Sequence, residues 1–97
     1  MPKTDNTIEP IDTTFRAIVT ADSKSGWACV QMPESAKFFG TGKSVKVGGT
    51  IAGEAYEATM LPVGGGTHML PLRAAIRRTL GLNLGNEVTV HLTRRLA

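Results

Sequence analysis

The chain has one cysteine, Cys29, and its aromatic residues make up only 5 % of its 97 residues. A lone cysteine excludes an internal disulfide and a Cys-x-x-Cys motif, and it suits a reducing compartment. The scarcity of aromatic side chains predicts a mainly aliphatic core. The sequence also lacks an apolar run near the roughly 20 residues of a membrane span, and its first residues lack the apolar middle of a signal peptide. We therefore expect one cytoplasmic domain without membrane association.

Acidic residues are nearly missing from the C-terminal part of the chain. From residue 73 onward Glu87 is the sole acid, against five arginines: Arg73, Arg77, Arg78, Arg94 and Arg95. The formal net charge of the whole chain is +3. A basic segment of this kind suits nucleic acid or another anionic partner, but it also suits a solvated helix face and a solubilising tail.

Hydrophobic periodicity predicts an all-β domain over residues 13–95, preceded by a flexible lead-in over residues 1–12. Six strands are expected, over residues 14–21, 26–32, 44–52, 55–61, 67–72 and 86–95. Short helices are expected over residues 33–39 and 72–80, each ended by a glycine, Gly40 and Gly81. Pro33 suits the first turn of the first helix, and Glu34 would complement its dipole. The pair Gly48-Gly49 predicts a bend or bulge in its strand.

The chain also repeats itself. Residues 42–47 and 85–90 share the pattern G-x-x-V-x-V, and each copy follows a strand, a short helix and a glycine. Two copies of one supersecondary unit predict a six-stranded barrel with pseudo-two-fold symmetry, in which each half buries the apolar face of the other.

Residues 69–92, MLPLRAAIRRTLGLNLGNEVTVHL, resemble the half-barrel unit of the AbrB/MazE swapped-hairpin proteins. The positions that match this unit are Leu70-Pro71, Ile76-Arg77, Leu80-Gly81-Leu82 and Val88-x-Val90. Asn86 stands where the unit usually has Asp. Residues 14–95 resemble more closely a bacterial family of unknown function that is often found beside YdeI/OmpD-associated bacteriocin-protection domains. The features that carry this resemblance are Phe15-x-Ala17, the VKVGGTIAGEAY run and LPVGGGTHMLPL.

The resemblance implies a double-split β-barrel with both repeats in one polypeptide and no established activity. AbrB-type proteins bind DNA as dimers through basic residues, which makes Arg73, Arg77 and Arg78 candidates for binding nucleic acid or another anion. The first repeat offers only Lys37, Lys43 and Lys46 at related places, so the two halves are not equivalent. Aromatic residues interleaved with the arginines, which would stack on single-stranded bases, are missing from this segment.

The run Gly64-Gly65-Gly66 before Thr67 and His68 has two interpretations: a phosphate loop that presents a catalytic imidazole, or a tight turn between strands. A strand rather than a helix follows the glycines, which favours the turn. His68, Thr67, Tyr56 and Trp27 are the candidates for lining a ligand pocket at the barrel mouth. We predict no metal site, because His68, His91 and Cys29 fall on separate strands without ligand spacing. We also predict no catalytic residues and no cofactor.

The sequence thus predicts a small non-enzymatic binding module for a small ligand or a protein partner, as a monomer or weak homo-oligomer. A DNA-binding barrel using the second helix is the first alternative, and an enzyme with a site near His68 is the second.

Overall fold

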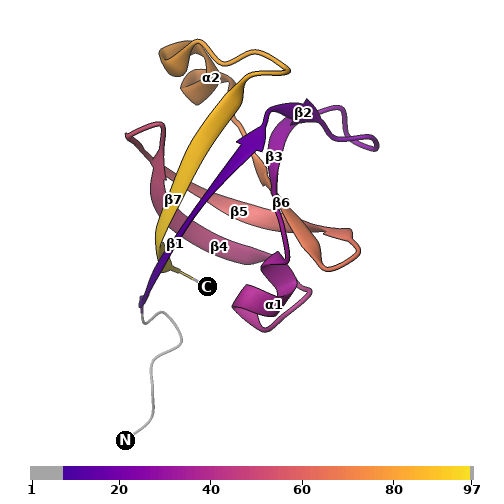
Figure 1. Cartoon of the computed structure of the whole chain (residues 1–97), viewed down its shortest axis with the longest axis vertical. Helices are drawn as coiled ribbons and strands as arrows, with labels where there is room; N and C mark the ends of the chain where they lie inside the picture. Colours follow the sequence, from indigo (N-terminus) through magenta and orange to yellow (C-terminus); the bar gives the residue numbers. More distant parts are fainter. Residues whose placement is uncertain (1–7, 97) are drawn as a thin grey trace, which may run out of the picture.

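The computed structural model describes residues 8–96, and these form a mostly β domain with two short helices (Figure 1). The strands are β1 (Glu9–Ile18), β2 (Thr20–Ala21), β3 (Ala28–Met32), β4 (Val45–Ile51), β5 (Glu54–Gly64), β6 (Thr67–Pro71) and β7 (Glu87–Arg95). The helices are α1 (Ser35–Phe39) and α2 (Ala74–Leu80). Within this part of the chain no helix has the length and apolar character needed to cross a membrane. The predicted class, mostly β with two short helices, is confirmed.

All strands found in residues 8–96 belong to one antiparallel sheet, in the order β1-β7-β4-β5-β6-β3-β2. The two edge strands, β1 and β2, are separated along the chain by Val19 alone, so the sheet must curl until its edges meet there. Figure 1 shows the curl, with β1 and β7 crossing β4 and β5. Val19 is buried, and its backbone exchanges hydrogen bonds of 2.8 Å with Asn86 and Gly85. The predicted count of six strands is wrong by one, because the bend at Val19 divides the strand expected over residues 14–21.

The first strand begins earlier than its apolar pattern suggested. Glu9 and Pro10 pair with Arg95 and Arg94 at the far end of β7, and the register shifts between Pro10 and Thr13. Side chains at this end are exposed or half-buried, so no strong periodicity marks the strand in the sequence. Residues 1–7, most of the lead-in expected over residues 1–12, lie outside the described part of the chain.

Both helices end as predicted, at glycines in the left-handed region: Gly40 with φ 72° and Gly81 with φ 64°. Their first turns differ from the prediction. Glu34 has φ 55° and stands before α1 rather than inside it, so its carboxylate is not in the first turn of that helix. The second helix starts at Ala74, two residues later than expected, because Arg73 is still extended.

The core is aliphatic, as the composition predicted. Both valine pairs of the repeated G-x-x-V-x-V pattern lie in it: Val45 and Val47 on β4, and Val88 and Val90 on β7. Each of these strands follows a strand and a short helix, and β4 pairs directly with β7. The two repeats therefore meet along one antiparallel ladder, and their helices stand at opposite ends of the sheet (Figure 1).

The bulge expected at Gly48-Gly49 is confirmed, since the β4–β7 register shifts between these two residues. A Cβ on Gly49 would overlap the carbonyl oxygen of His91 and come within 2.9 Å of the Leu92 Cα. The backbones of β4 and β7 approach each other here more closely than any side chain would permit.

Candidate functional site

His68, the residue of the glycine-rich segment with the most evident chemical potential, has no exposed surface. Its Nδ1 lies 2.7 Å from the Ser35 hydroxyl, and its Nε2 lies 2.7 Å from the Lys43 carbonyl oxygen. A carbonyl only accepts, so Nε2 carries the proton and Nδ1 accepts from Ser35. The Ser35 oxygen in turn accepts the backbone N–H of His68, at 2.5 Å. Every polar group of this buried set is satisfied within the protein.

This arrangement ties three parts of the chain together. It joins β6 to the first residue of α1 and to the segment that leads into β4, and the Phe39 ring packs edge-on against the imidazole. The Ser35–His68 contact resembles a nucleophile–base pair, but Ser35 also has no exposed surface. A substrate cannot reach either group, so the interpretation of His68 as a pocket residue is not supported by its position.

The glycines before His68 form a tight turn, which was the favoured interpretation. Gly64 pairs with Thr67, and Gly65 and Gly66 between them have φ 64° and 79°, values that favour glycine. The Gly66 carbonyl accepts the N–H of Ala36 at 3.1 Å. The turn therefore anchors the start of α1.

Cys29 is buried, and burial raises the pKa of its thiol, so it remains a protonated thiol near neutral pH. Among residues 8–96, no three His, Cys, Asp or Glu side chains come together in a way that could hold a metal ion. His91 instead binds Asp12, with 2.7 Å between Nε2 and the carboxylate.

Three of the seven candidate residues line one open cavity of about 520 Å³ between the start of β3 and the start of α2. We call it the Trp27 cleft. The side chains that define it are those of Trp27, Ala28, Pro71, Leu72, Arg73 and Arg77. None of the described residues that line it is acidic. Its size lies within the range of about 300–1,000 Å³ that is typical of ligand pockets.

Strand pairing brings the two walls of the cleft together. Cys29 pairs with Pro71, and the Ala28 carbonyl accepts the N–H of Leu72 at 2.9 Å. The residues just beyond this ladder are Trp27 on one strand and Arg73 on the other. Trp27 therefore lines the same cleft as Arg73, although the two residues are 46 positions apart along the chain.

Trp27 itself is held by a hydrogen-bonded turn over residues 22–27. The Asp22 carboxylate accepts the backbone N–H and the hydroxyl of Ser25, at 2.8 and 2.9 Å, and the N–H of Lys24 at 3.2 Å. The Trp27 carbonyl accepts the N–H of Asp22, which closes the turn. The hydrogen bonds from Ser25 are the main reason that the pKa of Asp22 is lowered. The backbone of Trp27 is thus fixed while 55 % of its surface stays exposed.

The three candidate arginines have different environments. Arg73 is fixed: its guanidinium donates to the Glu57 carbonyl at 2.7 Å and lies 4.5 Å from the centre of the Tyr56 ring. Arg77 is partly buried, and its Nε finds no hydrogen-bond partner among the described residues. Arg78 is exposed and lines a separate hollow of about 350 Å³ at the end of α2, without contributing to the Trp27 cleft.

The structure divides the two predicted sets, the anion-binding arginines and the pocket residues, in a different way. Trp27 from the pocket set lines the same cleft as Arg73 and Arg77, while Tyr56 packs against the Arg73 guanidinium and supports it. The Tyr56 hydroxyl donates to the Pro71 carbonyl at 2.6 Å and accepts the Arg73 N–H at 3.0 Å. Thr67 lies elsewhere, on a broad open groove of about 1,000 Å³ that Trp27 also lines. Sequence reasoning missed Ser35, which no local pattern signals, and Asp22, although Asp followed by Ser-Lys-Ser-Gly is typical of a turn.

The lowered pKa of Asp22 has a testable consequence. The carboxylate stabilises the turn at neutral pH, and this stabilisation is lost as the pH falls through the folded pKa, below its ordinary value of 3.8. We expect Trp27 emission to change in a transition with a midpoint below that value. The Asp22→Asn variant, which has no titrating group there, should lack this transition. An identical acid transition in the variant would contradict the role given to Asp22.

These features define a class of protein: a small, mostly β domain with a curled antiparallel sheet, two short helices and an open cleft. The family model described as a domain of unknown function (DUF1905) matches residues 15–92, so the chain belongs to that family. The resemblance to a family of unknown function is confirmed to this extent. None of the curated proteins matches the chain.

Proposed function

We propose that this chain is a small, non-enzymatic binding module and that the Trp27 cleft binds a ligand carrying an anionic group. The observation that carries the proposal is the presence of Trp27, Arg73 and Arg77 in one cavity without an acidic residue. Guanidinium groups bind carboxylates and phosphates through paired, charge-assisted hydrogen bonds.

Arg77 supplies the strongest argument for an anion. A covered donor without a partner costs free energy, on the order of 1–3 kcal/mol. The guanidinium is therefore in an arrangement that its protein neighbours do not satisfy. Arg77 lines the cleft, so an anion there would offer an acceptor to its guanidinium, whereas Arg73 is already held in place by Glu57 and Tyr56.

The test uses the single tryptophan of the chain as the reporter. Trp27 emission is followed at low salt while inorganic pyrophosphate is added. We expect a saturable change in the wild type. In Arg77→Ala the affinity should fall at least about tenfold, the loss expected for a charge-assisted hydrogen bond.

Arg78→Ala is the matched control, because it removes the same charge from the neighbouring, exposed position. It should bind pyrophosphate as the wild type does. An equal loss of affinity in both variants would show that net charge, and not the position of Arg77, determines binding. The absence of any saturable change in the wild type would contradict the proposal.

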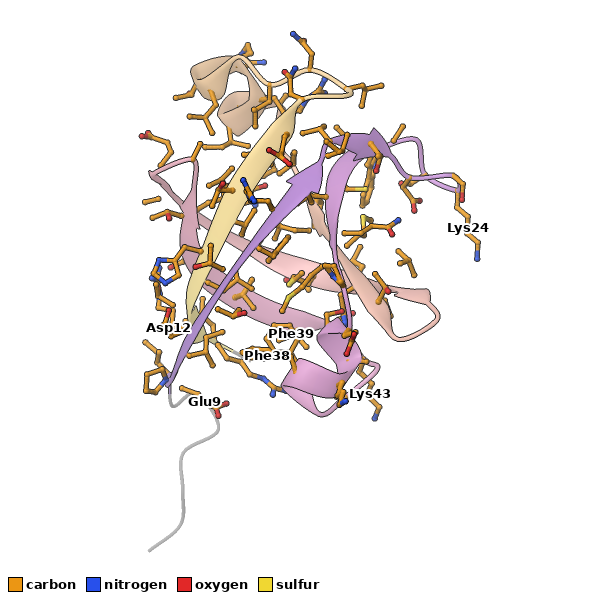
Figure 2. All side chains as sticks on the ribbon, viewed as in Figure 1. Glu9, Asp12, Lys24, Phe38, Phe39 and Lys43 are labelled. Carbon is orange, nitrogen blue, oxygen red and sulfur yellow. The ribbon has the colours of Figure 1, made fainter. Side chains whose placement is uncertain are left out.

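Duplex DNA is the second candidate, favoured by the basic run Arg73, Arg77 and Arg78 on and beside α2. It draws support from the AbrB-type double-split barrel that we propose for this fold. In the AbrB-like segment, Asn86 accepts the Asn83 N–H through its side-chain oxygen at 2.8 Å, a bond that Asp makes equally well. Lys43 of the first repeat does not extend this surface, since it lies near α1 at the other end of the molecule (Figure 2).

Arg78→Ala also separates the two candidates. Binding of labelled duplex DNA, followed by fluorescence anisotropy, would fall steeply with salt and would need Arg78 as much as Arg77. Ligand binding in the Trp27 cleft needs Arg77 but not Arg78, which does not line the cleft. Both candidates fit a module that acts in the cytoplasm as a monomer or weak homo-oligomer, as the sequence led us to expect.

A further inference from the structure

We propose that the ligand of the Trp27 cleft is a nucleotide, whose base stacks on the Trp27 indole and whose phosphate binds Arg77 and Arg73. This inference rests on the proposed function and adds the chemical class of the ligand. It follows from the two kinds of side chain that the cleft combines.

The aromatic wall is exposed without a structural reason. Trp27 is 55 % exposed, although the turn over residues 22–27 fixes its backbone on both sides. It is the sole tryptophan of a chain with few aromatics, and it lines the cleft and the neighbouring groove instead of joining the core. A fixed and accessible indole offers a flat apolar face, which stacks on any planar ring.

The base of the cleft suits the same ring. Ala28, Pro71 and Leu72 contribute apolar surface next to the indole, and the polar backbone groups here already pair with each other, as the Leu72–Ala28 hydrogen bond shows. The apolar side of the cleft, formed by the indole and these three residues, thus favours a flat, apolar group. It offers few hydrogen bonds that would select one base over another. We therefore infer stacking with little base specificity.

The basic wall binds the other half of a nucleotide. Arg73 is held by Tyr56 and Glu57, so it presents a fixed charge, and the Nε of Arg77 on α2 has no hydrogen-bond partner among residues 8–96. A purely anionic ligand would not use the indole, and an uncharged aromatic ligand would not use the arginines. A nucleotide uses both, and the volume of about 520 Å³ is sufficient for one.

From the sequence we did not expect base stacking, because no aromatic residue interleaves with the arginines of the α2 segment. In the fold, Trp27 takes this place, because the pairing of β3 with β6 brings it to the same cleft. The same nucleotide chemistry occurs in a free mononucleotide and in one residue of a single strand, and the experiment below distinguishes these sources.

Isothermal titration calorimetry on the full chain compares AMP with its two halves, adenosine and ribose 5-phosphate, and with pyrophosphate. We expect AMP to bind at least about tenfold more tightly than either half, since base–aromatic stacking is missing from ribose 5-phosphate and the charge-assisted hydrogen bonds to phosphate are missing from adenosine. Trp27→Ala should reduce the affinity for AMP to that for ribose 5-phosphate. Trp27→Phe, which keeps a stacking face, should retain most of it.

The inference is overturned if ribose 5-phosphate binds as tightly as AMP, or if Trp27→Ala leaves AMP binding unchanged. If pyrophosphate still binds in an Arg77-dependent way in that case, the anion-binding proposal stands and only the nucleotide assignment fails. If no anion binds, both fail. A (dT)8 oligonucleotide that binds over tenfold more tightly than dTMP identifies a single strand as the source, and equal affinities identify the free nucleotide.

Discussion

Replacing Gly49 by alanine is expected to lower the free energy of unfolding by about 3 kcal/mol or more. The added Cβ would overlap the His91 carbonyl oxygen and approach the Leu92 Cα, and both are backbone atoms of the neighbouring strand. Neither atom can move without separating β4 from β7. This ladder joins the two repeats, so the whole domain should lose stability, with a midpoint of thermal unfolding lower by on the order of 15 °C.

Gly48→Ala is the control for this experiment, one residue away on the same strand. A Cβ there would meet the Arg94 guanidinium, with the nearest atom at 2.6 Å, and that group is the far end of a flexible side chain. Arg94 can move at the cost of its exposed ion pair with Glu57, which contributes up to about 1 kcal/mol. Denaturant unfolding of the two variants measures the difference. Equal stabilities would show that the strands do not approach at Gly49 as the structure has them.

Replacing His68 by alanine is expected to cost about 3–4 kcal/mol of unfolding free energy. The change leaves a cavity beside Phe39 and removes the hydrogen-bond partners of the Ser35 hydroxyl and the Lys43 carbonyl. His68→Gln should recover part of the loss, because its amide nitrogen reaches about as far as Nε2 and can donate to Lys43.

Ser35→Ala provides the second half of a double-mutant cycle. It removes the acceptor of the buried backbone N–H of His68, and we expect the free energy of unfolding to fall by about 2 kcal/mol. The two losses should not add, because both variants break the same set of hydrogen bonds. A His68→Ala protein within about 0.5 kcal/mol of the wild type would contradict the structural role of the imidazole.

The sequence predicted those parts of the fold that depend on local pattern. The valines of G-x-x-V-x-V are in the core, Gly40 and Gly81 end their helices, and the turn at Gly65-Gly66 follows from backbone geometry that glycine favours. The early start of β1 escaped prediction because Glu9 and Pro10 are exposed and pair only with the end of β7.

The candidate site was harder to predict, since its residues meet only through strand pairing. Trp27 and Arg73 were named in separate sets, and the Ala28–Leu72 hydrogen bond that brings them together depends on the register of β3 and β6. His68 was predicted to line a pocket, and its burial was not predicted, because its contacts also come from distant parts of the chain. Its partner Ser35 is 33 positions away, and nothing in the sequence around either residue indicates that they meet.

We propose that this domain binds its ligand in the Trp27 cleft. The most direct test is a ¹H–¹⁵N NMR titration with pyrophosphate, which observes the single indole N–H and the Arg77 Nε–H separately. We predict that both signals shift with one dissociation constant, and that the Arg77 signal moves downfield as its Nε gains an acceptor. Shifts confined to Lys37 and Lys43 near α1, or no saturable shift at all, would contradict the claim.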